Sequence, residues 1–198
     1  REGGNAKTWK SLLKERETVF YVKSLERVCD LAKLGEGGVG AFAATAGGGG
    51  GAVGWLLGRR GTGRSNATVE VEVIHEARVD DDAVFAAAAD LELEVVGCAF
   101  FRASRDAGAA SFLLSAREVA TAAELQCEAM RRTEDARRPY TFATLVVSDD
   151  AAGLNTEAFE ASELTVQMAA EKVLAGPEAQ GDGADDMVNT TEPVVVER

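Results

Sequence analysis

Histidine is almost absent from this chain, and its scarcity limits the chemistry that the chain can perform. The 198 residues include one histidine, His75. A catalytic zinc ion needs three imidazole, carboxylate or thiolate ligands and an open position for water. A site with two histidine ligands therefore cannot be built from this sequence. His75 ends a predicted strand, where we expect a packed or hydrogen-bonded side chain rather than a metal ligand.

Cysteine is also scarce. Cys29, Cys98 and Cys127 are odd in number and widely spaced, and they form no Cys-x-x-Cys pair. This pattern predicts neither a disulfide framework nor a zinc ribbon. We expect the protein to reside in a reducing compartment.

Positive charge is in the minority. The chain has 21 Lys and Arg against 33 Asp and Glu, which gives a formal net charge of −12. Nonspecific binding to a phosphate backbone needs a basic surface, so the charge argues against a nucleic-acid partner. It fits a soluble protein whose partners are other proteins, basic ones among them.

Long apolar runs are missing as well. A membrane-spanning helix needs about 18 or more apolar residues in succession. The longest weakly apolar run, Val39–Leu57, is mostly Gly and Ala and lacks the flanks of a signal peptide. We therefore expect no membrane insertion.

The length suits one sizeable domain. The chain begins at Arg1 rather than Met, and its last residues, 192–198, resemble the start of a strand. We therefore expect a piece of a longer protein. The predicted divisions are a lead-in arm at 1–17, a domain at 18–175, an acidic linker at 176–187 and the start of a following strand at 188–198.

The order of the predicted elements indicates an α+β domain, a mixed β-sheet flanked by helices. Alternating or β-branched residues predict strands at Thr18–Lys23, Val53–Leu57, Thr68–His75, Glu94–Phe101, Thr141–Val147 and Thr156–Phe159. Apolar residues at spacings of three and four, with suitable N-terminal caps, predict helices at Ser24–Leu34, Asp80–Leu91, Ser115–Arg131 and Ala161–Leu174. In the strand Thr68–His75, we expect Val69, Val71 and Val73 to share one buried face.

A Gly/Ala segment, Gly35–Gly51, ends in five consecutive glycines. Glycine loses the most backbone entropy on ordering, so we predict a flexible insertion at 35–51 without regular structure. A phosphate-binding loop is the alternative, but the Gly-Lys-Ser/Thr ending of that motif is missing.

The most informative stretch is Leu93–Gln126. It contains a strand that reads Val-Val-Gly-Cys-Ala-Phe-Phe-Arg, a short Gly-containing gap, and then Phe-Leu-Leu-Ser followed by a helix. Ser115 and Glu118 have the spacing of a capping box, which is our interpretation of this serine. We expect Val119, Ala122, Ala123, Leu125, Gln126 and Met130 on the inner face of the helix.

This layout resembles the active-site segment of the MPN family of zinc-dependent isopeptidases and their inactive relatives. Catalytic members carry His-x-His after Val-Val-Gly and Ser-x-x-Asp at the start of the next helix. Here the two His positions are Phe100 and Arg102, and the Asp position is Glu118. The stretch matched to the family's catalytic glutamate is Val53–Gly58 followed by Arg59, a cation that would repel zinc. The resemblance implies an MPN/JAMM-like sheet with cytidine-deaminase-like layering that is not an enzyme, with no catalytic residue, metal or cofactor.

Among MPN proteins, the sequence is most similar to the nuclear protein localization protein 4 family. The matching stretches are Val-Gly-Trp-Leu-Leu-Gly at 53–58, Val-Glu-Val-Glu-Val-Ile-His-Glu at 69–76, Leu-Glu-Leu-Glu-Val-Val-Gly-Cys-Ala-Phe-Phe at 91–101, Phe-Leu-Leu-Ser at 112–115, Phe-Ala-Thr-Leu-Val-Val at 142–147 and Glu-Ala-Phe-Glu-Ala-Ser at 157–162. They follow in order over roughly residues 18–198.

The resemblance implies a non-catalytic module of the cofactor that recruits substrates to a hexameric AAA segregase, valosin-containing protein. The implied partners are polyubiquitin, the segregase and the ubiquitin-fusion-degradation cofactor. The implied process is ubiquitin-dependent and ER-associated degradation through the proteasome, in the cytoplasm and nucleus and at the cytosolic face of the ER. In that family the groove at the former active site guides an unfolded ubiquitin segment. This places Arg59, Phe100, Phe101, Arg102 and Phe112 at the candidate surface, unless the three Phe are core residues.

Two other hypotheses compete with this adaptor. An inactive MPN scaffold subunit of a proteasome-lid-like or translation-initiation complex would pair with a sister MPN domain. A long helical tail would favour that scaffold, whereas an acidic linker followed by a strand favours the adaptor. An active metalloisopeptidase is disfavoured because the His-x-His pair is missing.

Overall fold

The structure is a computed structural model. It describes residues 22–25, 28–46, 53–61, 68–76, 81–103, 114–132, 141–150, 153–176 and 191. The expected lead-in arm lies outside the described residues. So do the acidic linker and the following strand, apart from Gly176 and Thr191.

The described residues form strands and helices in the mixed order of an α+β domain, which confirms the predicted class. The strands are β1 (Val22–Ser24), β2 (Cys29–Asp30), β3 (Val53–Arg60), β4 (Val69–Glu76), β5 (Glu94–Ala103), β6 (Ala143–Asp150) and β7 (Gly153–Ala161). The helices are α2 (Gly35–Ala46), α3 (Asp81–Asp90), α4 (Ala116–Arg132) and α5 (Glu163–Ala170).

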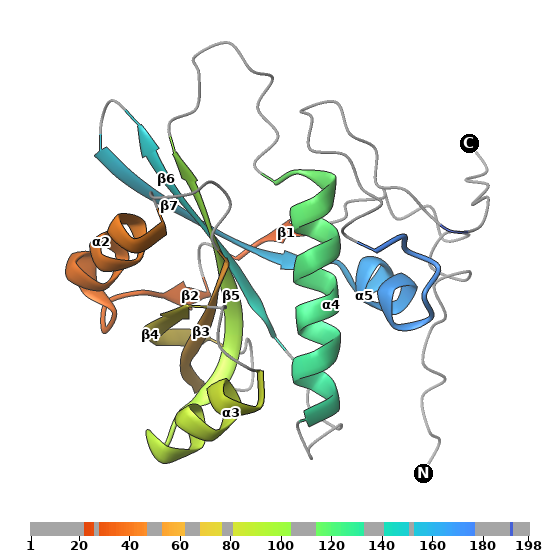
Figure 1. The fold of residues 1–198 in the computed structure, drawn as a ribbon, viewed down its shortest axis with the longest axis horizontal. Coiled ribbons are helices and arrows are strands. Elements are labelled where there is room, and N and C mark those ends of the chain that lie inside the picture. Colours follow the sequence, from red (N-terminus) through yellow and green to blue (C-terminus); the bar gives the residue numbers. More distant parts are fainter. Residues whose placement is uncertain are drawn as a thin grey trace.

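All described strands belong to one mixed sheet, in the order β1-β7-β6-β5-β3-β4-β2. β3 pairs antiparallel with β4, and β6 with β7. β5 and β6 are parallel, and α4 lies in the connection between them, as a parallel pair requires. The carboxyl ends of β5 and β6 therefore lie at the same end of the sheet, near the start of α4 (Figure 1).

Helices cover both faces of the sheet (Figure 1). α2 packs on one face through its buried residues Val39, Phe42, Ala43 and Ala46. α3 and α4 pack on the other face, and α5 packs beside α4. The side chains of β5 alternate between the two cores, as a strand buried on both faces requires.

Gly97 allows the central strands to approach one another closely. It pairs with Ala143 of β6 and with Leu56 of β3. A Cβ at this position would lie 2.0 Å from the carbonyl oxygen of Ala143 and 2.9 Å from Leu56 Cδ1. Only glycine fits at this point without moving the strands.

The helix predicted over Ser24–Leu34 is wrong. This segment instead contains the last residue of β1, Ser24, and the whole of β2, and these two strands lie at opposite edges of the sheet. The Leu25 N–H donates to Ala158 O at 2.7 Å, and the Val69 N–H donates to Val28 O at 2.7 Å. Long-range pairing at the sheet edges outweighs the local helical spacing, because helix propensity is a weak preference.

The prediction that the Gly/Ala segment lacks regular structure is wrong for residues 35–46, which form α2. Residues 47–51 lie outside the described residues. The buried residues of α2 recur at helical spacing, and their burial against the sheet offsets the entropic cost of its glycines.

The other predicted strands and helices are confirmed, with shifted ends. Of the predicted strand Thr18–Lys23, the structure describes only the last two residues, which belong to β1. β7 begins at Gly153, earlier than expected, and α5 ends at Ala170 rather than Leu174. Met130 is 43% exposed, so its predicted place on the inner face of α4 is wrong.

A β-bulge in β4 reverses the direction of its side chains. The register with β3 shifts at Glu72, which is the extra residue. Val69 and Val71 pack on the α2 side, whereas Val73 packs into the core on the other face. The expected common face is therefore wrong for Val73, and Ile74 packs on the α2 side instead.

Candidate binding site at the start of helix α4

An ion pair joins the end of β5 to the first turn of α4. Arg102 Nε donates to Glu118 Oε1 at 3.0 Å, and Arg102 Nη2 donates to Oε2. The two side chains are 22% and 17% exposed. Two parallel hydrogen bonds between a guanidinium and a carboxylate fix the geometry of both groups.

The same carboxylate belongs to a capping box, which confirms that prediction. The Ser115 N–H donates to Glu118 Oε2 at 2.7 Å, and the Glu118 N–H donates to Ser115 Oγ at 3.3 Å. The Ser115 hydroxyl also donates to Oε2, at 3.0 Å. Negative charge in the first turn is favourable against the helix dipole. Glu118 is therefore held by both Arg102 and Ser115.

Buried residues of β5 and β6 lie next to this pair. Ser148 pairs with Arg102 across the two strands and is buried. Deeper in the core, Cys98 Sγ lies 3.9 Å from Thr144 Oγ1. Burial raises the pKa of the Cys98 thiol to about 12; the contact with Thr144 opposes this rise, and the charge of Glu118 adds to it. The thiol is therefore neutral at physiological pH.

Two of the predicted surface residues are core residues. Phe100 is 3% exposed and packs on the α4 side, while Phe101 is 5% exposed and packs on the α2 side. The ring of Phe101 meets that of Phe42 edge-on, with 6.5 Å between centroids. Neither contributes appreciably to the surface, and the core alternative is confirmed for both. Phe112 lies outside the described residues.

Arg59 lies far from the other candidates, at the opposite end of the sheet. Val53 of β3 pairs with Phe100, whereas Gly58 pairs with Glu94. Arg102 is eight residues beyond Glu94 on β5, about 26 Å of strand at about 3.3 Å per residue. Arg59 instead donates from Nε to Glu72 Oε1 at 3.0 Å. Its predicted place in the same site is therefore wrong, because any contribution of β3 would come from the Val53 end.

The polar groups of this site are paired with one another. Ser115 donates its hydroxyl proton to a carboxylate that Arg102 already neutralises, and an activated serine needs a free base beside it. No three His, Cys, Asp or Glu side chains among the described residues lie close enough together to hold a metal ion.

Within the described ranges, no helix is long and apolar enough to span a bilayer.

The sequence did not predict a pocket between α2 and β4, which is lined by Phe42, Ile74 and Glu76 among others. It was missed because α2 was expected to lack regular structure. The available signal was the helical spacing of Val39, Phe42 and Ala46.

Comparison with protein-family models gives no match for this chain. Comparison with curated proteins gives no match either.

Proposed function

We propose that the chain is a non-catalytic module of a segregase cofactor that binds polyubiquitinated substrates and delivers them to an AAA ATPase for unfolding. The ordered motifs from residue 53 to residue 162 support this proposal. The single observation that carries its non-catalytic part is the Arg102–Glu118 ion pair. The pair occupies two positions at which catalytic members of the resembled family place zinc ligands. We propose in the same way that the mixed sheet has MPN/JAMM-like layering.

The ion pair opposes metal binding on simple electrostatic grounds. A guanidinium repels a divalent cation, and it also neutralises the carboxylate that would otherwise attract one. What remains is a rigid, partly exposed polar group at the end of a buried strand. A group held in this way can contribute hydrogen bonds to a bound polypeptide at little entropic cost.

The proposed partners are polyubiquitin, the segregase hexamer and the ubiquitin-fusion-degradation cofactor. The proposed places of action are the cytoplasm, the nucleus and the cytosolic face of the ER. The formal net charge of −12 is consistent with protein partners rather than nucleic acid.

Affinity capture from a eukaryotic cell lysate tests this proposal. The immobilised chain is expected to recover the AAA segregase and polyubiquitin, both identified by immunoblot. Arg102→Gln is expected to recover less polyubiquitin, whereas the matched control Arg59→Gln, at the opposite end of the sheet, recovers as much as the unmodified chain. Circular dichroism confirms that both variants are folded. Recovery of a stable sister MPN subunit without the segregase would support the scaffold hypothesis and overturn the proposal.

A further inference from the structure

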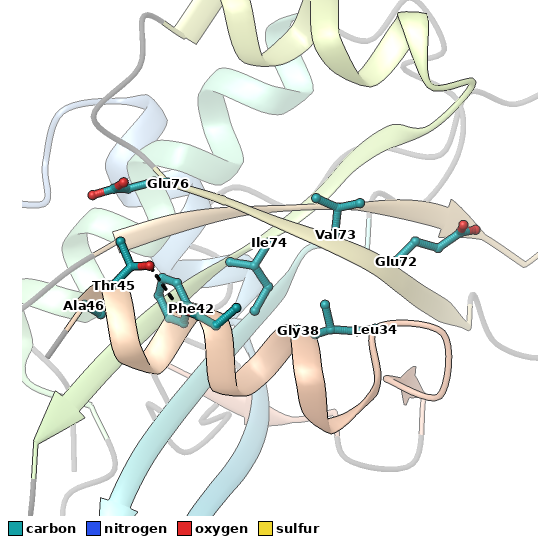
Figure 2. Close-up of a pocket in the computed structure, with 10 residues that line it drawn as sticks. Leu34, Gly38, Phe42, Thr45, Ala46, Glu72, Val73, Ile74 and Glu76 are labelled. Carbon is teal, nitrogen blue, oxygen red and sulfur yellow. Dashed lines mark hydrogen bonds between the residues drawn. The ribbon is translucent and has the colours of Figure 1, made fainter.

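A pocket of about 290 Å³ lies between α2 and β4, on the face of the sheet opposite α4. Phe42 and Ile74 are among its apolar lining residues, and Glu72 and Glu76 are among its polar ones. Figure 2 shows Ile74 pointing from β4 toward α2, with Glu72 and Glu76 on either side of it along the strand. The volume is at the lower end for ligand sites. It suits one or two side chains rather than a large cofactor.

The pocket lies next to an open edge of the sheet. β2 pairs with β4 only at Val69 and Glu70. From residue 71 to residue 76, no strand among the described residues pairs with the side of β4 that faces away from β3. An open edge offers backbone N–H and C=O groups to another strand. Peptides bind such edges by adding a strand, with neighbouring pockets selecting side chains.

This edge is acidic. It carries Glu70, Glu72 and Glu76 from β4 and Asp30 from the adjoining β2. Lys33 pairs with two of these carboxylates, at 2.9 Å from Glu70 and 3.2 Å from Glu72, and Arg59 pairs with Glu72 at 3.0 Å. A second copy of the chain would bring the same acidic edge and a further net charge of −12. Charge complementarity therefore favours a basic partner.

We propose that the open edge of β4 and the α2–β4 pocket bind an extended, basic segment of a partner protein. Glu72 is the bulge residue, and Ile74 and Glu76 follow it at every second position; all three line the pocket. An added strand with the pattern basic-x-apolar-x-basic places its apolar residue beside Ile74 and its basic residues beside Glu72 and Glu76. The inference does not rest on the proposed function, because Arg102 and Glu118 lie on the α4 side of the sheet.

The test uses two synthetic nine-residue peptides and the isotope-labelled chain in solution. One peptide has Lys-Thr-Val-Thr-Lys at its centre, and in the other both lysines are glutamates. The lysine peptide is expected to shift the amide signals of residues 71–76 and of α2 in a saturable manner, and to slow hydrogen exchange along β4. The glutamate peptide is expected to bind at least about tenfold more weakly, because two attractive cross-strand pairs become repulsive.

Matched variants show whether the lysine peptide binds at the α2–β4 pocket. Ala41 and Ala44 are both exposed on α2, but only Ala41 lines the pocket. Ala41→Trp is expected to abolish binding by filling the pocket, whereas Ala44→Trp leaves it unchanged. Glu76→Lys is expected to weaken binding of the lysine peptide and to strengthen binding of the glutamate peptide. This variant tests charge complementarity without filling the pocket.

Several results would overturn the inference. Equal effects of the two Trp variants, equal affinity for the two peptides, or signal shifts centred on Arg102 instead of β4 would each contradict it. A concentration-dependent dimer that protects the β4 edge in the absence of peptide would show that a second copy is the occupant, and would contradict the basic partner.

Discussion

Arg102 and Glu118 are the residues on which the non-catalytic proposal depends, and their contact can be measured as stability. Each side chain is about one-fifth exposed, at 22% and 17%, so solvent screens the pair only in part. Arg102→Gln is expected to lower the free energy of unfolding by about 1–2 kcal/mol, measured by urea denaturation. Arg59→Gln, which breaks a more exposed pair, is expected to cost about 0.5 kcal/mol or less.

A double-mutant cycle with Glu118→Gln isolates the pair from the helix cap. Glutamine at this position can still accept a hydrogen bond from the Ser115 N–H, so the capping box is largely kept. The coupling energy between Arg102→Gln and Glu118→Gln is expected to be about 1 kcal/mol. A coupling energy near zero would contradict the expected contribution of this pair to stability.

The cysteines supply a prediction that depends on pH. Burial, together with the charge of Asp30, raises the pKa of Cys29 to about 11, and burial raises that of Cys98 to about 12, from an ordinary value of 9.0. The folded state therefore holds these protons after the unfolded chain has released them. Stability is expected to be unaffected below about pH 9 and to fall as pH rises from about 9 toward 12.

This prediction is checked by urea denaturation at pH 8 and pH 10, with Cys98→Ala as the control. The variant is expected to lose less stability between the two pH values than the unmodified chain. At pH 8, an aromatic disulfide reagent is expected to react much more slowly with the folded chain than in urea, because the thiolate is the reactive form. Fast reaction of all three thiols in the folded chain would contradict the burial described here.

At the scale of elements, two glycines have opposite roles. A Cβ at Gly97 would collide with a backbone oxygen of β6, whereas a Cβ at Gly40 of α2 meets no atom within 4 Å. Gly97→Ala is expected to lower the free energy of unfolding by about 1–3 kcal/mol or more. Gly40→Ala is expected to raise it by about 0.5–1 kcal/mol. Thermal and urea denaturation measure both, and a destabilised Gly40→Ala variant would argue against α2.

The elements also show which parts of the fold local patterns can predict. The strands β3 to β6 and the capped helix α4 were predictable because apolar spacing and the Ser115–Glu118 cap are local signals. β2 was not, because its backbone partner β4 is distant in sequence. α2 was missed because its many glycines argued against a helix. Its apolar residues stabilise the helix only by packing against the sheet, which the local sequence does not show.

The candidate site, too, could be predicted from the sequence only in part. The spacing of Ser115 and Glu118 predicted the cap, and the resemblance singled out the positions of Arg102 and Glu118. Their contact spans 16 residues and a connection between two elements, which local spacing does not determine. The misplacement of Arg59 has a different cause. Val53 and Arg59 lie toward opposite ends of β3, and only the register with β5 shows which of the two lies near Arg102.

At the scale of the whole molecule, the non-catalytic proposal predicts low zinc affinity. The purified chain, dialysed without chelator and analysed by plasma mass spectrometry, is expected to contain far less than one zinc per chain. The guanidinium of Arg102 is the physical reason. Stoichiometric zinc that only a chelator removes would contradict the proposal.

The most direct test of the central claim is size-exclusion chromatography of the purified chain mixed with mixed-linkage polyubiquitin, followed by a denaturing gel of each fraction. The account predicts that the chain co-elutes with polyubiquitin and that the ubiquitin chains remain intact, with or without added zinc. Separate elution at high micromolar concentration, or conversion of polyubiquitin to monomers, would contradict it.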